Sequence, residues 1–170
     1  MRWILMCLLS AVIVVAQAEE KAFFSSRSLS VEFAAKVAWQ ALLECRKRGY
    51  SVAVAVVDKG GNVQAFYRDR LAGPHTVQTA IQKAWTAVSF RVNTNDLAEM
   101  LRRGEIPNQV QHNPGALLVG GGVMIQSQGE LIAAVGVSGA PPGKSEKDSI
   151  DGLCAIQGIK SIEEDLAFSD

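Results

Sequence analysis

Residues 51–67 read SVAVAVVDKGGNVQAFY, and this stretch decides the fold. Its first seven residues form a short, Val-rich run, which favours a strand over a helix. Residues 58–62 are of types that tolerate a positive φ angle, as a tight turn requires, and Val63 to Tyr67 returns as a second strand. Because strands joined by a short turn are antiparallel, the stretch predicts a β-hairpin.

Helical patterns lie on both sides of this hairpin. Before it, apolar residues recur at helical spacing over residues 33–45, after an expected N-cap at Ser30. After it, residues 76–90 have the same spacing, and a shorter helix capped by Thr94 or Asn95 follows. Residues 102–115 are polar, contain two prolines and predict a surface loop.

The second half of the chain adds three expected strands, at residues 116–119, 123–127 and 131–137. A last helix is expected to run from Ser145, where a capping box is formed with Asp148, to about residue 166. The predicted element order is αββααβββα. This order indicates an α+β fold with a five-stranded, mostly antiparallel sheet flanked by helices.

Composition bounds the class of protein. The chain has 170 residues, 48% of them hydrophobic, which fits one globular domain. Lys+Arg and Asp+Glu both total 17, so the basic surplus typical of nucleic-acid binding is missing. We therefore expect no nucleic acid among the partners.

The N-terminus has the order of a secretory signal peptide. Arg2 precedes an apolar run over residues 3–16, shorter than the ~20 residues that span a bilayer, and Ala16-Gln17-Ala18 is a small-x-small cleavage site. An uncleaved membrane anchor is the alternative. We expect a signal peptide at 1–18, a loose arm at 19–28 and a single domain at 29–170. The protein is then exported, to the periplasm or the extracellular space, with no membrane association after cleavage.

Two cysteines remain after such cleavage, Cys45 and Cys154. Their spacing excludes a local CxxC redox motif, and without clustered histidines they make a poor zinc site. In an oxidising compartment they form either a bridge between the first and last helices or two buried free thiols, and both alternatives stay open.

The residue types point to little chemistry by themselves. The sequence contains no Walker loop, no HExxH and no nucleophile elbow. The triglycine Gly120–Gly122 is better explained as a bulge or sharp bend than as a phosphate loop, because no Lys and helix follow it. His75 and His112 are the two imidazoles, and each is more often a surface residue than a ligand. His75 opens a helix close to Arg68 and Arg70, either a ligand-binding cationic edge or a solvated one.

Several motifs taken together resemble the GlcG/HbpS-like haem-binding proteins, over about residues 29–159. They are the hairpin 54–62, Gly73-Pro74, the stretch 83–90 (KAWTAVSF), Pro114-Gly115, the triglycine with Val123, the stretch 136–141 (GVSGAP), and Asp151 with Cys154-Ala155. The resemblance, which is strongest to the secreted branch, implies a profilin-like fold, reversible haem binding and homo-oligomerisation. It also implies, in some members, a sensor or haem-pathway protein as partner.

The resemblance also implies ligand residues. By position, the axial iron ligand is the hydroxyl of Thr94, while His75 is the alternative offered by a histidine-using relative. The cations Arg70, Lys83 and Arg91 are candidates for pairing with haem propionates. Trp85 and Phe90 either pack on the porphyrin or belong to the core.

Three classes of function follow from these observations. The first is an exported haem-binding protein in haem carriage, scavenging or redox sensing. The second is an accessory protein without catalytic activity that binds a small non-haem ligand such as a hydroxy acid. An enzyme is the weakest of the three, because the sequence offers no convincing nucleophile or acid–base pair, and any activity would depend on haem.

Overall fold

The computed structural model describes residues 22–141 and 149–168. The predicted signal peptide at 1–18 and the Ser145–Asp148 capping box lie outside these residues. The described part of the predicted arm, residues 22–28, contains no helix or strand. No helix among the described residues is long and apolar enough to cross a membrane.

The described elements make an α+β fold around one antiparallel sheet. Its strands are β1 (Ala53–Asp58), β2 (Val63–Arg68), β3 (Gly122–Ser127) and β4 (Glu130–Ser138), in the order β2-β1-β4-β3. The hairpin predicted from residues 51–67 forms, with Ala55 opposite Phe66. Each neighbouring pair of strands is antiparallel.

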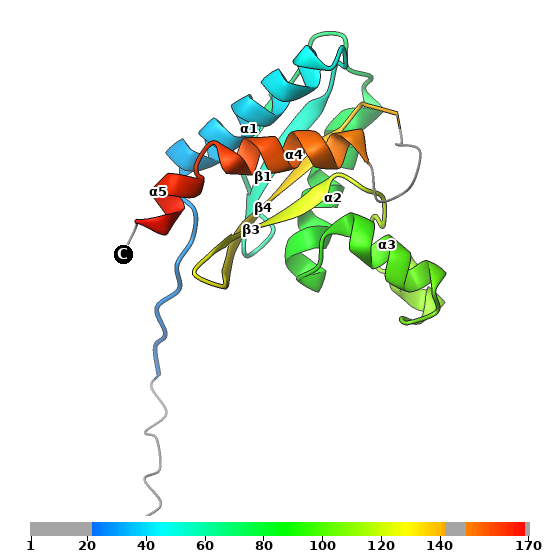
Figure 1. The fold of residues 1–170 in the computed structure, drawn as a ribbon. Helices are drawn as coiled ribbons and strands as arrows, with labels where there is room; N and C mark the ends of the chain where they lie inside the picture. The colour runs from blue at the N-terminus through cyan, green and yellow to red at the C-terminus, as the bar shows by residue number, and fades with distance from the viewer. Residues whose placement is uncertain (1–21, 142–148, 169–170) are drawn as a thin grey trace, which may run out of the picture.

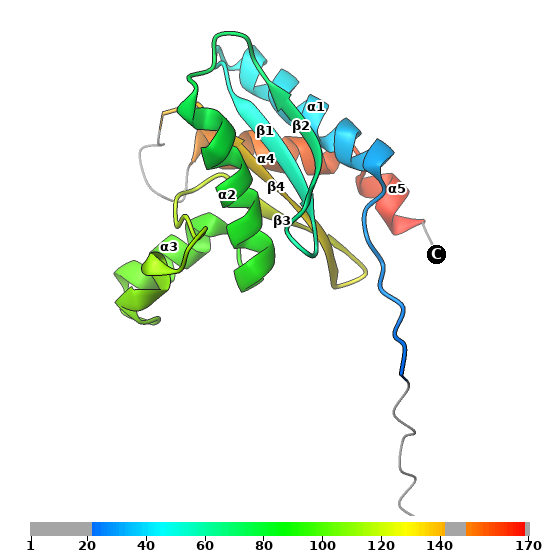
Figure 2. The same ribbon diagram turned by 180° about the vertical axis from the view of Figure 1, so that it is seen from behind.

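Helices cover both faces of this sheet. On one face lie α1 (Val31–Lys47) and α4 (Ile150–Lys160); on the other lies α2 (His75–Phe90) (Figures 1 and 2). The remaining helices are α3 (Thr94–Arg102), the short 3₁₀ helix η1 (Asn108–His112) and α5 (Glu163–Ala167). The alternation of strand β1 explains the two layers, because Val54 and Val56 pack with α1 and α4 while Ala53 and Ala55 pack with α2.

The small residues between α2 and the sheet bring the helix unusually close. A Cβ placed on Gly136 of β4 would lie 2.0 Å from the carbonyl oxygen of Ala80. Ala84 and Ala87 are also fully buried against the sheet. The backbone of α2 therefore lies almost directly on strand β4.

The prediction of a fifth strand at residues 116–119 was wrong: the described residues form four strands. The amide of Leu117 donates to the side-chain hydroxyl of Thr86 on α2 at 2.8 Å, and the amide of Ala116 donates to Asn113. Because these two amides already donate to a helix side chain and to a loop carbonyl, they are not available for the hydrogen bonds that pair a strand with its neighbour. The expected order αββααβββα therefore has one β too many.

Three helix boundaries also differ from the prediction. The helix expected to start at a Thr94 or Asn95 cap has Asn93 as its N-cap, and Thr94 is its first residue. The last helix starts after Ser149, whose hydroxyl accepts from the amide of Gly152 at 3.3 Å. It ends at Lys160, where the amide and the hydroxyl of the C-cap residue Ser161 both donate to the carbonyl of Gly158, and α5 follows separately. The predicted loop at 102–115 contains η1.

Cys45 of α1 and Cys154 of α4 are joined by a disulfide, with both residues fully buried. Of the two alternatives that the sequence leaves open, the structure contains the bridge. Close beside it, a Cβ on Gly158 would lie 2.6 Å from the carbonyl oxygen of Val37, so α1 and α4 touch through their backbones. The bridge and the glycine together hold the two helices as one layer.

Candidate functional site

The triglycine Gly120–Gly122 is where the predicted site residues Lys83 and Thr94 meet. A Cβ on Gly122 would lie 2.3 Å from the carbonyl oxygen of Lys83 and 2.5 Å from Cγ2 of Thr94. A Cβ on Gly121, whose φ is +122°, would lie 3.0 Å from the ammonium nitrogen of Lys83. The bend predicted here is therefore also a close crossing of α2, α3 and β3, which requires residues without side chains.

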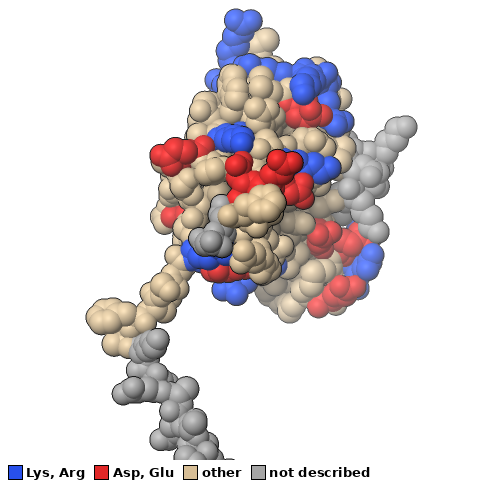
Figure 3. Space-filling view, turned by 60° about the vertical axis from the view of Figure 1, so that its left-hand side comes forward, with Lys and Arg blue, Asp and Glu red and all other residues tan. Residues whose placement is uncertain are grey.

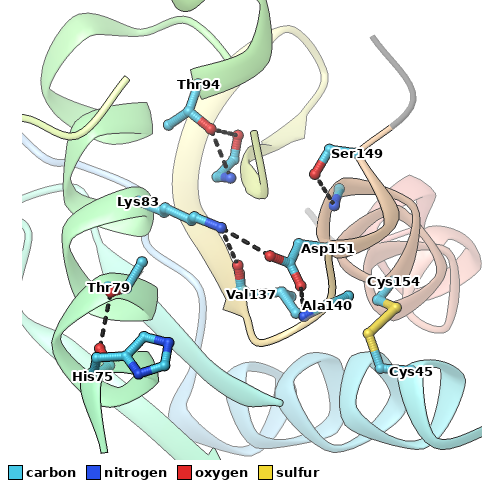
Figure 4. Close-up of polar contacts among 12 residues, drawn as sticks. Cys45, His75, Thr79, Lys83, Thr94, Val137, Ala140, Ser149, Asp151 and Cys154 are labelled. Atoms are coloured by element: carbon cyan, nitrogen blue, oxygen red, sulfur yellow. Dashed lines mark hydrogen bonds and ion pairs between the residues drawn. A yellow bond between two sulfur atoms is a disulfide. The ribbon is translucent and has the colours of Figure 1, made fainter. Parts of the chain in front are cut away.

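Lys83 is held in a buried ion pair with Asp151. Its side chain is 3% exposed and that of Asp151 is 6% exposed. The ammonium group donates to Oδ2 of Asp151 at 2.9 Å and to the carbonyl of Val137 at 3.0 Å (Figure 4). Oδ1 of Asp151 accepts from the amide of Ala140 at 3.0 Å. The pKa of the Asp151 carboxyl is raised, because the effect of burial outweighs that of the Lys83 ammonium, which alone would lower it. Lys83 is therefore already paired, and its charge is not presented to a ligand.

Thr94, the predicted iron ligand, is also engaged. The residue is fully buried at the start of α3. Its hydroxyl oxygen accepts from the amide of Gly122 at 2.8 Å and lies 3.4 Å from the carbonyl oxygen of the same residue. This hydroxyl satisfies a backbone donor that would otherwise be buried without a partner. In this chain Thr94 joins α3 to β3, so its hydroxyl would have to share or give up these contacts to bind an iron.

A small cleft lies next to Thr94, between α3, the triglycine and α4. It has a volume of about 160 Å³ and combines polar residues of α3 with the apolar side chains of Val123, Leu153 and Ile156. Oδ1 of Asn95 is buried there and has no hydrogen-bond partner within the described part of the chain. An unpaired buried acceptor is costly, so this oxygen is ready to accept from a ligand donor. The cleft is smaller than the ~300 Å³ at which pockets for drug-sized ligands begin, too small to enclose a porphyrin.

His75 stands apart, at the first turn of α2 (Figure 4). It is exposed, and among the described residues its imidazole forms no hydrogen bond; only its backbone carbonyl is used, accepting from the hydroxyl of Thr79 at 2.9 Å. The imidazole lies over Gly73, where a Cβ would come 2.7 Å from Cε1 of the ring. The preceding turn exposes Arg70 and Leu71, the latter by 77%. Imidazole, cation and apolar side chain thus lie within six residues of one another, where the exposed β2–α2 connection meets the start of α2.

The other residues named with the haem site are placed elsewhere. Arg91 is the C-cap of α2, so it lies at the opposite end of the helix from His75, about 24 Å away at 1.5 Å per residue. Trp85 lies between two turns, because Cβ atoms on Gly61 and Gly115 would come within 2.6 Å and 3.5 Å of its ring. Phe90 is half-buried at the end of α2.

Two roles in the triglycine region were not predicted from the sequence. Asp151 is the ion-pair partner of Lys83, and Asn95 has a buried acceptor oxygen without a partner among the described residues. Asp151 lies 68 residues from Lys83, so no local pattern connects them. Asn95 could have been found through the triglycine. A Cβ on Gly120 would lie 2.7 Å from Oδ1 of Asn95, and three consecutive glycines in a sequence indicate such close packing. Among the described residues, no group of three or more His, Cys, Asp or Glu is arranged to hold a metal ion.

Comparison with known proteins places the chain among relatives of one kind. Protein GlcG of Escherichia coli K12 is 32% identical over 110 residues, covering 65% of this chain and 81% of the relative. The crystal structure of a double mutant of HbpS from Streptomyces reticuli matches with 34% identity and a TM-score of 0.75, covering 86% of this chain and 94% of that one. A crystal structure of a PduOC–haem complex matches with 25% identity and a TM-score of 0.71, covering 80% and 96%.

The family model described as "Haem degrading protein HbpS-like" matches residues 29–160, from the residue before the α1 cap to the end of α4. This range contains the whole sheet, the Lys83–Asp151 pair and the triglycine. The chain therefore belongs to the HbpS-like family, together with GlcG.

Proposed function

We propose that this protein binds haem reversibly through the exposed connection that carries His75. The structural observation that carries the proposal is an exposed imidazole without a hydrogen-bond partner among the described residues, next to an exposed cation and an exposed leucine. Membership of the HbpS-like family and the likeness to a haem-bound PduOC structure support haem as the ligand.

The residues of this connection fit the chemistry of haem. A neutral imidazole is a good axial ligand for haem iron, the exposed Leu71 would offer apolar contact, and the exposed Arg70 would be the cation that pairs with a propionate. Thr94 and Lys83 have other partners in the fold, so this proposal gives them no ligand role. Bound haem would supply the redox-active iron, and the protein would contribute binding and orientation.

The exposure of this connection supports an oligomer. A porphyrin held by His75, Arg70 and Leu71 alone would keep one face in water, because all three residues are exposed in the single chain. We propose that a second copy covers that face, so that the complete site belongs to a homo-oligomer.

We further propose that the protein is exported and acts in haem carriage, scavenging or redox sensing, with a sensor or haem-pathway protein as partner. The signal-peptide pattern of residues 1–18 supports export. The disulfide supports it too, because such bridges persist in oxidising compartments. A surface site with one axial ligand suits a protein that gives its haem away.

The cleft beside Thr94 favours a second candidate, binding of a small hydroxy acid or a similar non-haem ligand. Its volume of about 160 Å³ suits only a few heavy atoms, and the orphan Oδ1 of Asn95 would accept from a hydroxyl group. This candidate requires no iron ligand.

A haemin titration of the purified protein, followed at the Soret band, tests the first proposal. We expect a saturable shift that His75→Ala weakens and His112→Ala leaves unchanged. His112 is the matched control, because the chain has two histidines and this one is exposed in η1. Thr94→Ala should lower the unfolding temperature, since it leaves the amide of Gly122 without its acceptor.

The same titration separates the candidates. If the Soret shift is no larger than that of an unrelated control protein, haem binding is wrong. Glycolate titrated against Asn95→Leu and the parent protein, followed by amide NMR shifts around the cleft, then tests the second candidate.

A further inference from the structure

The chain carries an apolar protrusion that its own body does not cover. Phe23 is 88% exposed and Phe24 is 91% exposed, on an arm with no regular structure. The arm stands away from the domain in all the views that show it (Figures 1 to 3). Two adjacent aromatic side chains left in water are the kind of exposed apolar feature that marks an interaction site.

The base of the same arm is fixed to the domain. Arg27 donates to Oε1 of Gln128 at 3.3 Å and to the hydroxyl of Ser127 at 3.4 Å, both at the β3–β4 hairpin. The amide of Leu29 donates to the carbonyl of Ile132 at 3.5 Å. The direction of the arm is therefore set at Arg27, and of the described residues before it, Phe23 and Phe24 stay exposed.

A groove opens at this anchoring point. It has a volume of about 300 Å³ and lies between the arm base, the start of α1, the hairpin and α5, with Leu29, Phe33, Ile132 and Leu166 as its apolar lining. A second hollow of about 230 Å³, which also includes Ser127 and Leu166, continues it along α5. Together the two hollows have enough volume to hold two aromatic side chains.

The arm of the same copy is poorly placed to fill this groove. Only Ser25 and Ser26 lie between Phe24 and the anchored Arg27, so folding back would require a full chain reversal within two residues. An extended arm, by contrast, carries Ala22 about 17 Å away from Arg27, which is reach enough for a neighbouring molecule.

The protrusion and the groove match each other, and both belong to one chain, so the occupant that fits is a second copy. We propose that two copies exchange arms, Phe23 and Phe24 of each copy filling the Leu29–Phe33–Leu166 groove of the other. Such an exchange is isologous and closes as a twofold dimer. Four phenylalanines at ~150 to 250 Å² each, with a comparable area lost by the two grooves, bury roughly 1,200 to 2,000 Å² in total, which is the range of stable protein interfaces.

The first test is sedimentation velocity of the purified, haem-free protein over a concentration series. The double variant Phe23→Ser/Phe24→Ser should weaken self-association by about 100-fold or more. It cannot unfold the domain, because these side chains contact almost nothing. Val119→Ser is the matched control, since Val119 is 49% exposed and does not line the groove. Equal association of the parent and the double variant would overturn the proposal.

The second test identifies the occupant. p-Benzoylphenylalanine at position 24 is photo-crosslinked in a mixture of ¹⁵N-labelled and unlabelled chains, and the products are mapped by mass spectrometry. Mixed-isotope crosslinks to the segments around Phe33 and Leu166 support arm exchange. Crosslinks within one chain only, or between chains but away from the groove, overturn it. Because both tests are made without haem, they do not depend on the proposed haem site.

Discussion

At the scale of single residues, the site residues named from sequence divide by their exposure. Lys83 and Thr94 are buried and each has a hydrogen-bond partner in the backbone of the sheet, whereas His75, Arg70 and Arg91 are exposed. Residue type cannot distinguish these cases, because a lysine or threonine that holds a fold has the same letter as one that binds a ligand. What separates them is a partner 28 to 68 residues away.

The ion pair of Asp69 with Arg46 makes stability depend on pH. The Arg46 guanidinium, at 2.7 Å from the carboxylate, holds the pKa of Asp69 below its ordinary value of 3.8. The lowered pKa means that the stabilisation is complete above the unfolded-state pKa and is lost as the pH falls through the folded-state value. Asp69→Asn should therefore unfold at a lower temperature than the parent at pH 7, and the gap should begin to narrow near pH 4 and close only below the lowered pKa of Asp69. Thermal unfolding at a series of pH values measures this, and a gap that stays constant down to acid pH would contradict it.

The buried pair of Lys83 and Asp151 is a second residue-scale prediction. Lys83→Met leaves a carboxylate 6% exposed without its countercharge, which should cost about 3 to 5 kcal/mol of unfolding free energy. Adding Asp151→Asn should recover part of the loss, because the buried group is then neutral. Urea unfolding of the parent and the variants at pH 7 measures both steps, and a double variant no more stable than Lys83→Met would contradict the assignment.

At the scale of elements, glycines decide how closely the layers approach. Gly136 lets α2 lie on β4, and Gly158 lets α4 lie on α1. In sequence, Gly158 is an unfavourable residue inside a helix, and the facing atoms of Val37 and Ala41 in α1 explain it.

Two alanine substitutions within α4 test this argument. A Cβ on Gly158 would lie 2.6 Å from the carbonyl oxygen of Val37, whereas the nearest atom to a Cβ on Gly152 would be 3.6 Å away. Gly158→Ala should therefore destabilise by about 1 to 3 kcal/mol, while Gly152→Ala should stabilise by about 0.5 to 1 kcal/mol. Chemical denaturation gives both values, and equal effects of the two substitutions would refute the close contact.

Elements were predictable where their pattern is local. The hairpin of residues 51–67 and the helices over residues 33–45 and 76–90 follow from periodicity and turn chemistry alone. The strand expected at 116–119 has strand-like residues, but Thr86 of a distant helix takes the amide of Leu117. The helix expected to reach residue 166 ends at Lys160, and α5 begins separately at Glu163. The missing strand arises where a side chain competes with the backbone for a hydrogen bond.

At the scale of the whole molecule, the disulfide is the longest covalent constraint. It joins residues 109 apart in sequence, so it removes much of the freedom of the unfolded chain. Cys45→Ala/Cys154→Ala should lower the unfolding free energy by about 4 kcal/mol. Denaturation of the double variant beside the parent, with and without a reductant, measures it. The variant should not respond to the reductant, and a parent that is equally indifferent would show that the bridge is not formed.

The path of the chain gives the same bridge another consequence. All four strands lie between Cys45 and Cys154, so the sheet is contained in a covalent ring closed by the disulfide. The arm and most of α1 precede the ring in the chain, and the end of α4 and α5 follow it. The exposed stretch 111–115 lies inside that ring. A protease that cuts there opens the ring without releasing a fragment, and converts one chain into two that stay linked by a single bond.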